Sequence, residues 1–233
     1  MPALTEQWEP VEAFARLGVV AFTTTRAAGD FGVPSVAPTP DVRARWEDLL
    51  RGIPGAQRLA SARQVHGRAV LLHSGDWEGW RRVDGADGHA TTVAGTALVV
   101  TVADCVPIFL AHPSGAVGVL HAGWRGVAAR VLDAGLDAMA SLGAPANELH
   151  VHLGPSISGR NYEVGPDVYR ALTGWETVRP RRVDLRALIA EQARERGVRH
   201  LTATHVCTRE NSDRFFSHRG GDAERQVAVI VAK

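Results

Sequence analysis

Short apolar runs separated by turn-forming residues dominate the hydrophobic pattern of this chain. Three of them follow one another closely in the middle, at residues 97–102, 107–111 and 116–120. Each is rich in β-branched or other apolar residues and has the length expected of a buried strand. The same pattern predicts further strands at residues 17–23, 68–73, 149–153, 200–204 and 227–232.

Three other segments carry apolar residues at helical spacing. Residues 42–51 form one, and residues 127–142 form a longer one that we expect to stop at Gly143. The third begins after Asp184, a good N-terminal cap, and ends at Gly197. Strands alternating with helices, without repeats or a clear linker, predict a single α/β (α+β) domain over residues 1–233 with mixed β-sheets.

Composition and charge narrow the range of functions. The formal net charge of +1 provides no basic surface for nucleic acid, so we expect no nucleic-acid partner. Two cysteines cannot form a disulfide framework, which favours a reduced cytoplasmic setting. No apolar run is long enough to cross a bilayer, and the first residues lack a signal-peptide pattern. We expect a cytoplasmic monomer with no membrane contact.

One thiol and two imidazoles are the main chemical candidates. Cys105 and His121 lie at the ends of predicted strands, and His66 stands in a turn just before another. One thiolate with two imidazoles suits a zinc ion that keeps a coordination position open, and the same donors also suit Cu²⁺. The spacing is not that of a zinc finger, so a buried cysteine with two hydrogen-bonded histidines is the alternative.

Charged residues beside these candidates suggest further roles. Asp104 adjoins the thiol and is a candidate base or partner of a ligand. Arg125 lies between two glycines that permit close approach of the backbone, which suits a phosphate. The alternative is that Trp124 packs in the core and Arg125 pairs with a surface carboxylate.

Aromatic and cationic residues near the C-terminus form another candidate binding region. Phe216 would stack on a base or sugar, although a Phe-Phe pair is more often packed in the hydrophobic core. Arg219 in this region, and Arg26 at the end of the first predicted strand, are candidates to grip a phosphate together with Arg125.

Several motifs occur in an order that resembles the YfiH-like family, long labelled multicopper polyphenol oxidoreductase (laccase). They are Gln64-Val65-His66-Gly67, Ala103-Asp104-Cys105-Val106-Pro107, His121-Ala122-Gly123-Trp124-Arg125-Gly126, Gly154-Pro155-Ser156-Ile157 and Phe215-Phe216-Ser217-His218-Arg219. The resemblance runs from about Phe22 to the C-terminus. The chain departs from the family pattern after Arg26 and at His218-Arg219-Gly220-Gly221, where Tyr-Arg-Arg-Asp is usual.

The resemblance implies an α/β/β/α layered sandwich, distantly shared with bacterial toxin deamidases. It also implies metal ligands at His66, Cys105 and His121. The implied activity is that of a zinc-dependent purine nucleoside phosphorylase that cleaves adenosine, inosine and methylthioadenosine with phosphate and also deaminates adenosine. For deamination, zinc would activate water for attack at purine C6, and Asp104 would shuttle protons.

Two other enzyme classes and one binding class compete with this interpretation. A metal-free hydrolase would use Cys105 as nucleophile and His121 as base, and peptidoglycan-precursor editing would fit that class. A polyphenol oxidase (laccase) needs about ten histidines, largely in His-x-His pairs. This chain has ten histidines but only one such pair, His150 and His152. A structural zinc protein would need a fourth protein ligand, for which His205 and Cys207 are candidates.

Overall fold

Two six-stranded mixed β-sheets form the centre of the structure, a computed structural model that describes residues 7–33 and 38–233. The first sheet, in spatial order, contains β1 (Trp8–Pro10), β2 (Ala21–Thr24), β14 (Gln226–Val231), β7 (Thr96–Val102), β3 (Arg58–Arg63) and β5 (Gly79–Asp84). The second contains β13 (His200–Ala203), β10 (His150–Leu153), β8 (Val106–Ala111), β9 (Val117–Ala122), β6 (Gly88–Thr91) and β4 (Val70–Leu72). A separate small pair is formed by β11 (Glu163–Val164) and β12 (Arg181–Arg182).

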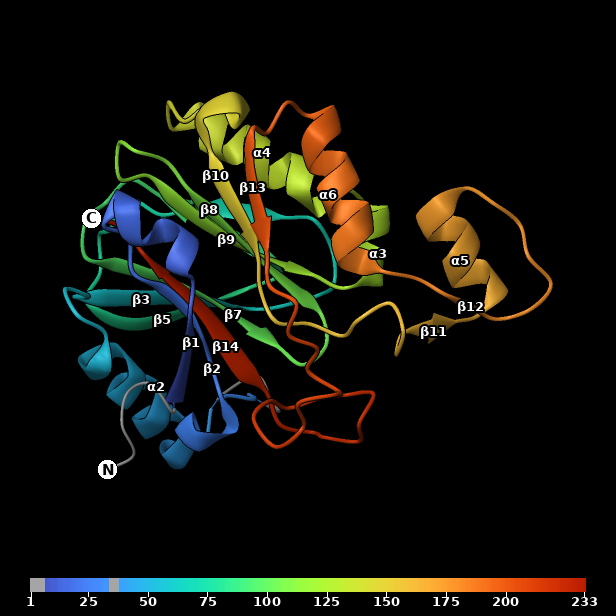
Figure 1. Cartoon of the computed structure of the whole chain (residues 1–233). Coiled ribbons are helices and arrows are strands. Elements are labelled where there is room, and N and C mark those ends of the chain that lie inside the picture. The colour runs from blue at the N-terminus through green and yellow to red at the C-terminus, as the bar shows by residue number, and fades with distance from the viewer. Residues whose placement is uncertain (1–6, 34–37) are drawn as a thin grey trace.

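The sheets are stacked and each is covered by helices on its outer face, which gives four layers (Figure 1). The first sheet is covered by α2 (Pro40–Gly52), and the second by α3 (Trp124–Ala128), α4 (Val131–Ser141) and α6 (Leu185–Glu195). Helix α5 (Pro166–Thr173) lies with β11 and β12 at one side of the layers. This arrangement agrees with the expected α/β/β/α sandwich.

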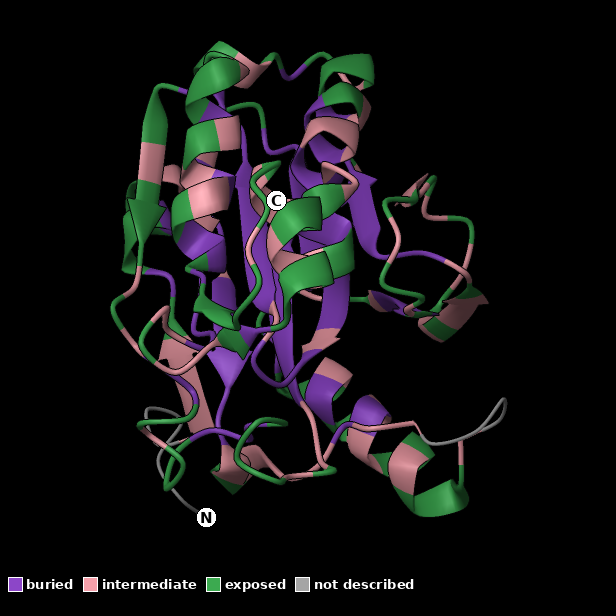
Figure 2. Cartoon of the chain, turned by 90° about the vertical axis from the view of Figure 1, so that its right-hand side faces the viewer, coloured by how far each residue is buried: buried purple, intermediate pink, exposed green. Residues whose placement is uncertain are grey.

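Three apolar clusters fill the three interfaces between the layers. Strand β7 shows how, because Leu98 and Val100 point between the sheets whereas Ala97 and Val99 point toward α2. Alternate residues of a strand lie on opposite faces, so a strand buried on both faces is apolar throughout. Figure 2 shows the result, with mainly buried strands and helices that are exposed on their outer faces. The uninterrupted apolar runs in the sequence are therefore central strands.

The connection between β7 and β8 carries the chain from one sheet to the other. Residues 103–105 make this crossing, and Asp104 has a φ of +80° there. Strand β8 then pairs antiparallel with β9, with Pro107 opposite His121. Cys105 is thus held at the end of the sandwich, close to the last residues of β9.

Most of the expected strands and helices are present, but one helix was predicted wrongly. Residues 127–142 do not form one helix, because the chain breaks between α3 and α4 at Arg130, which has a φ of +58°. The Arg130 side chain forms ion pairs with Asp133 and Glu195, which hold this left-handed residue in place. The apolar stripe could not reveal the break, since both short helices pack on the same sheet.

The hydrophobic pattern along the sequence does not predict several strands and one helix of the structure. The pattern predicts neither helix α5 nor strands β1, β3, β5, β6, β11 and β12. Residues 17–20 precede β2 instead of belonging to it. The arginine-rich strand β5 lies at the edge of its sheet, and α5 contains no fully buried residue, so neither carries a strong apolar signal. Residues 27–40 are rich in Gly, Ala and Pro, which is typical of a loop, but residues 34–37 lie outside the described residues. No helix among the described residues is long and apolar enough to cross a lipid bilayer.

Candidate metal centre

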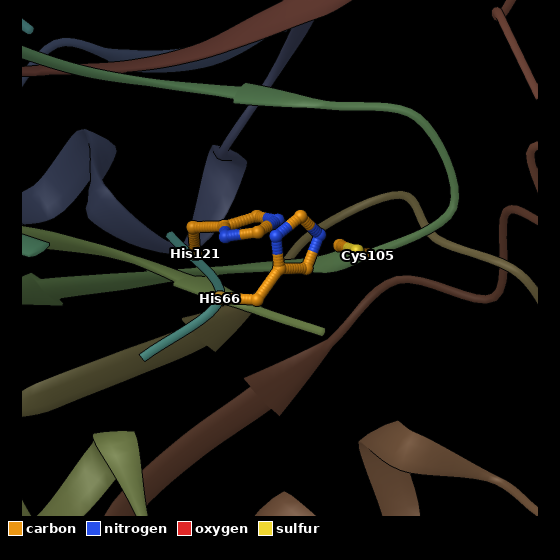
Figure 3. Close-up of side chains that lie close together, drawn as sticks. All are labelled: His66, Cys105 and His121. Atoms are coloured by element: carbon orange, nitrogen blue, oxygen red, sulfur yellow. The ribbon is translucent and has the colours of Figure 1, made fainter. Parts of the chain in front are cut away.

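His66, Cys105 and His121 converge at one end of the space between the two sheets (Figure 3). One ligand atom from each lies within 4.8 Å of the others, and the two imidazole rings meet edge to face at 4.8 Å between centroids. His121 is a residue of β9, Cys105 precedes β8, and His66 follows β3. Within residues 7–33 and 38–233, this is the one group of three or more such side chains placed to share an ion.

Gln64 attaches the loop that carries His66 to strand β7. Its side-chain amide donates to the carbonyl oxygen of Thr101 at 2.8 Å and accepts from the N–H of Thr101 at 2.7 Å. This pair of hydrogen bonds imitates a strand pairing just beyond the β3–β7 ladder. The His66 backbone, which has a φ of +58°, is thereby held near the end of β7.

Asp87 is the buried carboxylate that holds the His121 ring and the backbone of the His66 loop. One oxygen accepts from Nδ1 of His121 at 2.8 Å and from the backbone N–H of His66 at 2.9 Å. The other accepts from the N–H groups of Val65 and Gly67 at 3.2 and 2.7 Å. A carboxylate on Nδ1 leaves Nε2 of His121 to face Cys105 and a metal ion.

The electrostatics of the group favour an ionised thiol. Burial alone would raise the pKa of Cys105, but the charges and hydrogen bonds of His121 and His66 lower it to about 6. Burial would lower the pKa of His121, but the Cys105 thiolate and the Asp87 carboxylate raise it to about 9. A thiolate is the form of cysteine that binds metals and acts as a nucleophile.

Gly123 leaves the space that the three side chains need. A Cβ at this position would lie 3.0 Å from Sγ of Cys105 and 3.0 Å from Cδ2 of His66. Gly126 has a related role, because its Cβ would lie 3.2 Å from the carbonyl oxygen of Gly67. The two glycines of the His-Ala-Gly-Trp-Arg-Gly motif therefore let α3 approach the centre closely.

The donor set fits a zinc ion. Donors around a tetrahedral zinc ion lie roughly 3.3–3.6 Å apart, given Zn–N and Zn–S bonds of about 2.1 and 2.3 Å. The present separations of up to 4.8 Å require only small side-chain movements. Two imidazoles, one thiolate and a buried carboxylate behind one imidazole are the components of a zinc site with an open position.

Two cavities meet at these side chains. The larger, of about 610 Å³, is lined by residues such as Trp46, Arg63, His121 and Arg225. The smaller, of about 300 Å³, is lined by residues such as Trp124, Arg125, Tyr162 and Arg219. Both volumes lie within the range of small-molecule sites, and His66 and Cys105 line both cavities.

Asp104 is placed differently from what the sequence suggested. Its carboxylate accepts from Oγ1 of Thr208 at 2.6 Å and from the backbone N–H of Arg219 at 2.6 Å. It lies in the wall of the smaller cavity, but both of its oxygens tie loops together. The geometry therefore favours Asp104 as a brace for the Cys105 turn, and Asp87 as the partner of a ligand.

Arg125 and Arg219 are brought together in the smaller cavity. The guanidinium of Arg125 lies 4.4 Å from the ring centre of Trp124, and that of Arg219 lies 5.0 Å from the ring centre of Tyr162. Nη1 of Arg219 also donates to the carbonyl oxygen of Glu163 at 2.9 Å. Two guanidinium groups held over aromatic rings make a cationic pocket beside Cys105.

Arg26 and Phe216 do not line either cavity among the described residues. Arg26 forms an ion pair with Asp222 at 2.5 Å and donates from Nε to the carbonyl oxygen of Phe215 at 3.1 Å. Its guanidinium lies 4.5 Å from the ring centre of Phe216, which is buried. These contacts brace the loop before β14, so the structure does not support phosphate binding or base stacking here.

Asp87 is the residue of this site that the sequence interpretation missed. It lies in Asp84-Gly85-Ala86-Asp87-Gly88, which is typical of a turn. The turn directly precedes β6, which pairs antiparallel with β9, the strand that carries His121. A carboxylate at the start of a strand next to a candidate ligand is the signal that would have found it.

Comparison with known proteins gives consistent matches. Residues 31–233 match the family described as multi-copper polyphenol oxidoreductase laccase. A protein of Mycobacterium tuberculosis named purine nucleoside phosphorylase is 39% identical to this chain, and the alignment covers 90% of each chain. A protein of Deinococcus radiodurans with the same name is 36% identical, and the alignment covers 95% of this chain and 92% of the relative. The crystal structure of YlmD from Geobacillus stearothermophilus matches with a TM-score of 0.85 and 27% identity, covering 97% of this chain and 96% of the other.

Proposed function

We propose that this chain, which belongs to the family described as multi-copper polyphenol oxidoreductase laccase, is a zinc-dependent purine nucleoside phosphorylase. Its substrates would be adenosine, inosine and methylthioadenosine with phosphate, and it would also deaminate adenosine. Relatives in two bacteria carry the name purine nucleoside phosphorylase, which supports this class of reaction. We further propose that it acts in the cytoplasm as a monomer.

The observation that carries this proposal is the position of His66, Cys105 and His121 where two cavities meet. A reaction of two substrates needs adjoining places for both, next to the group that activates one of them. The larger cavity has the volume for a nucleoside, and the smaller has two guanidinium groups suited to phosphate. We assign the nucleoside to the larger cavity and phosphate to the smaller.

Each residue then has a defined task. His66, Cys105 and His121 would hold the zinc ion, and Asp87 would orient the His121 imidazole and hold the backbone of His66. Arg125 and Arg219 would hold the phosphate dianion and place its oxygen for attack on ribose. When bound, zinc supplies a Lewis acid beside the substrates.

A multicopper centre does not fit these residues. Laccase chemistry requires several copper ions, each held by its own protein donors. The described residues contain one group of three donors, and the His-x-His pair lies elsewhere on β10. We therefore propose no laccase reaction, although one Cu²⁺ ion would fit the same three donors.

The test is to incubate the metal-analysed protein with inosine or adenosine, with and without phosphate, and to identify the products by chromatography. We expect hypoxanthine and ribose 1-phosphate from inosine only when phosphate is present, and inosine from adenosine without it. Cys105→Ala should lower both activities at least about 100-fold, because it removes a ligand. Cys207→Ser is the matched control, since Cys207 is buried outside both cavities. Purine release that is independent of phosphate would contradict the proposal.

A metal-free hydrolase is the second candidate, because Cys105, His121 and Asp87 form a thiol–imidazole–carboxylate series. The position of His66 separates the two candidates, since a Cys–His pair does not need a second imidazole. His66→Ala should abolish zinc binding and phosphorolysis together. Turnover that survives both this substitution and chelation would favour the hydrolase.

A further inference from the structure

His218 is the remaining ionisable side chain at the junction of the two cavities. Among the described residues, four line both cavities: His66, Ala103, Cys105 and His218. His66 and Cys105 are donors of the candidate metal centre, and Ala103 has no group that exchanges a proton. Any acid or base acting where the cavities meet, apart from the metal ligands, is therefore His218.

The backbone of His218 is anchored on both sides. The N–H of Ser217 donates to Oδ2 of Asp222 at 2.8 Å, and Ser217 itself is buried. The N–H of Arg219 donates to Oδ2 of Asp104, the residue next to Cys105, at 2.6 Å. The carbonyl oxygen of His218 accepts from the N–H of Gly221 at 3.1 Å. This turn is thus fixed relative to the Cys105 turn, as a catalytic group requires.

The imidazole of His218 is available to a substrate. The residue is exposed, and no hydrogen bond from its ring to another described residue is present. By contrast, Asp104 has both carboxylate oxygens engaged, and the guanidinium of Arg219 is held by Glu163 and Tyr162. The imidazole of His218 is therefore free to exchange a proton with a bound nucleoside.

Phosphorolysis of a purine nucleoside needs a proton at this place. A phosphate oxygen forms a bond to ribose C1′ while the bond from C1′ to purine N9 breaks and its electron pair stays on the purine. The purine is a poor leaving group unless its N7 gains a proton as that bond breaks. With phosphate in one cavity and the purine in the other, the breaking bond lies at the junction.

We propose that His218 is the general acid that protonates purine N7 during phosphorolysis, an inference that rests on the proposed function. The imidazolium of His218 gives its proton to N7 as N9 departs. It regains a proton from the hydrogen phosphate whose oxygen has become bonded to C1′. The products are the neutral purine and the ribose 1-phosphate dianion, so atoms and charge balance.

The test compares inosine with 7-methylinosine in the wild-type protein and in His218→Gln. The imidazole ring of 7-methylinosine already carries a positive charge, so its purine leaves without protonation. We expect kcat on inosine to fall about 100-fold to 10,000-fold in the variant, the usual contribution of a general acid. The kcat on 7-methylinosine should be unchanged. His205→Gln, an exposed histidine that lines neither of these cavities, is the matched control.

The zinc content and melting temperature of His218→Gln should match those of the wild type. This control shows that any loss of activity comes from the missing acid and not from a lost metal ion. Equal losses on both nucleosides would overturn the inference and leave His218 as a binding residue only. An unchanged kcat on inosine would overturn it as well. Absence of phosphate-dependent purine release in the wild type would instead reject the proposed function, and the role of His218 with it.

Discussion

Single residues account for the geometry of the candidate centre more than any pattern along the chain does. Asp87 is fully buried and accepts four hydrogen bonds, three from consecutive backbone N–H groups and one from His121. Burial raises the pKa of Asp87, but the hydrogen bonds from His121 and Gly67 lower it overall, so the carboxylate stays ionised. One side chain therefore positions two ligands that are 55 residues apart in the sequence.

Asp87→Asn should weaken zinc binding. The amide oxygen can accept some of the hydrogen bonds, but its NH₂ group would face N–H donors and lose the others. We expect zinc affinity to fall about 10-fold to 100-fold, the usual effect of losing the partner of a metal-bound histidine. Competition with a chromophoric chelator measures this. Asp76→Asn is the control, since Asp76 pairs with Arg81 at the surface; equal affinity in both variants would contradict the role given to Asp87.

Among the secondary structure elements, α4 shows how tightly a helix packs on the sheet that carries His121. Gly135 faces Leu120 of β9, and a Cβ at this glycine would lie 2.5 Å from Cδ1 of Leu120. Glycine weakens a helix, so its presence here is explained by the short distance between helix and strand. Leu120 adjoins His121, and the contact therefore supports the position of the ligand strand.

Gly135→Ala and Gly52→Ala should have opposite effects on stability. Gly135→Ala forces Leu120 or α4 to move, and overpacking of this kind lowers the free energy of unfolding by about 1–3 kcal/mol. In Gly52→Ala, the new Cβ on α2 meets nothing within 4 Å. This substitution should raise the free energy of unfolding by about 0.5 kcal/mol, because alanine lowers the backbone entropy of the unfolded chain. Urea unfolding of both variants measures the difference. A stabilised Gly135→Ala protein would contradict the close packing of α4 on β9.

In the whole molecule, the candidate centre joins parts of the chain that the fold brings together from both sheets. His66 extends from β3 of the first sheet, His121 belongs to β9 of the second, and Cys105 lies on the connection between them. An ion held by all three would therefore link the two sheets at this end of the sandwich. Binding of this kind stabilises the folded state, because the unfolded chain does not keep the donors together.

Removal of the metal should lower the melting temperature. At a free zinc concentration 100 times the Kd, the lost stabilisation is about 2.7 kcal/mol. Thermal unfolding followed by circular dichroism, with and without a chelator, measures the shift. His66→Ala should melt at the same temperature under both conditions, since it lacks one donor. If the chelator shifts the melting temperature of wild type and His66→Ala equally, the ion does not bind at these residues.

The sequence alone determined the features that depend on residues close together in the chain, such as strands and helix caps, or on the chemistry of single side chains. The continuous apolar runs predicted β7, β8, β9 and β14. Asp184 predicted the start of α6, and its carboxylate does accept a hydrogen bond from the N–H of Ala187 at 3.1 Å. Such signals are local, since burial on both faces of a strand is written along the strand itself. The choice of one thiol and two imidazoles as a donor set followed from their chemistry.

Only the tertiary structure decided which polar groups meet. It placed Asp87 behind His121, turned the carboxylate of Asp104 to Thr208 and Arg219, and paired Arg26 with Asp222. It also broke the expected long helix at Arg130 and opened two cavities that join at Cys105. These outcomes depend on hydrogen bonds and packing between residues distant in the chain, and no periodicity along a sequence records such contacts.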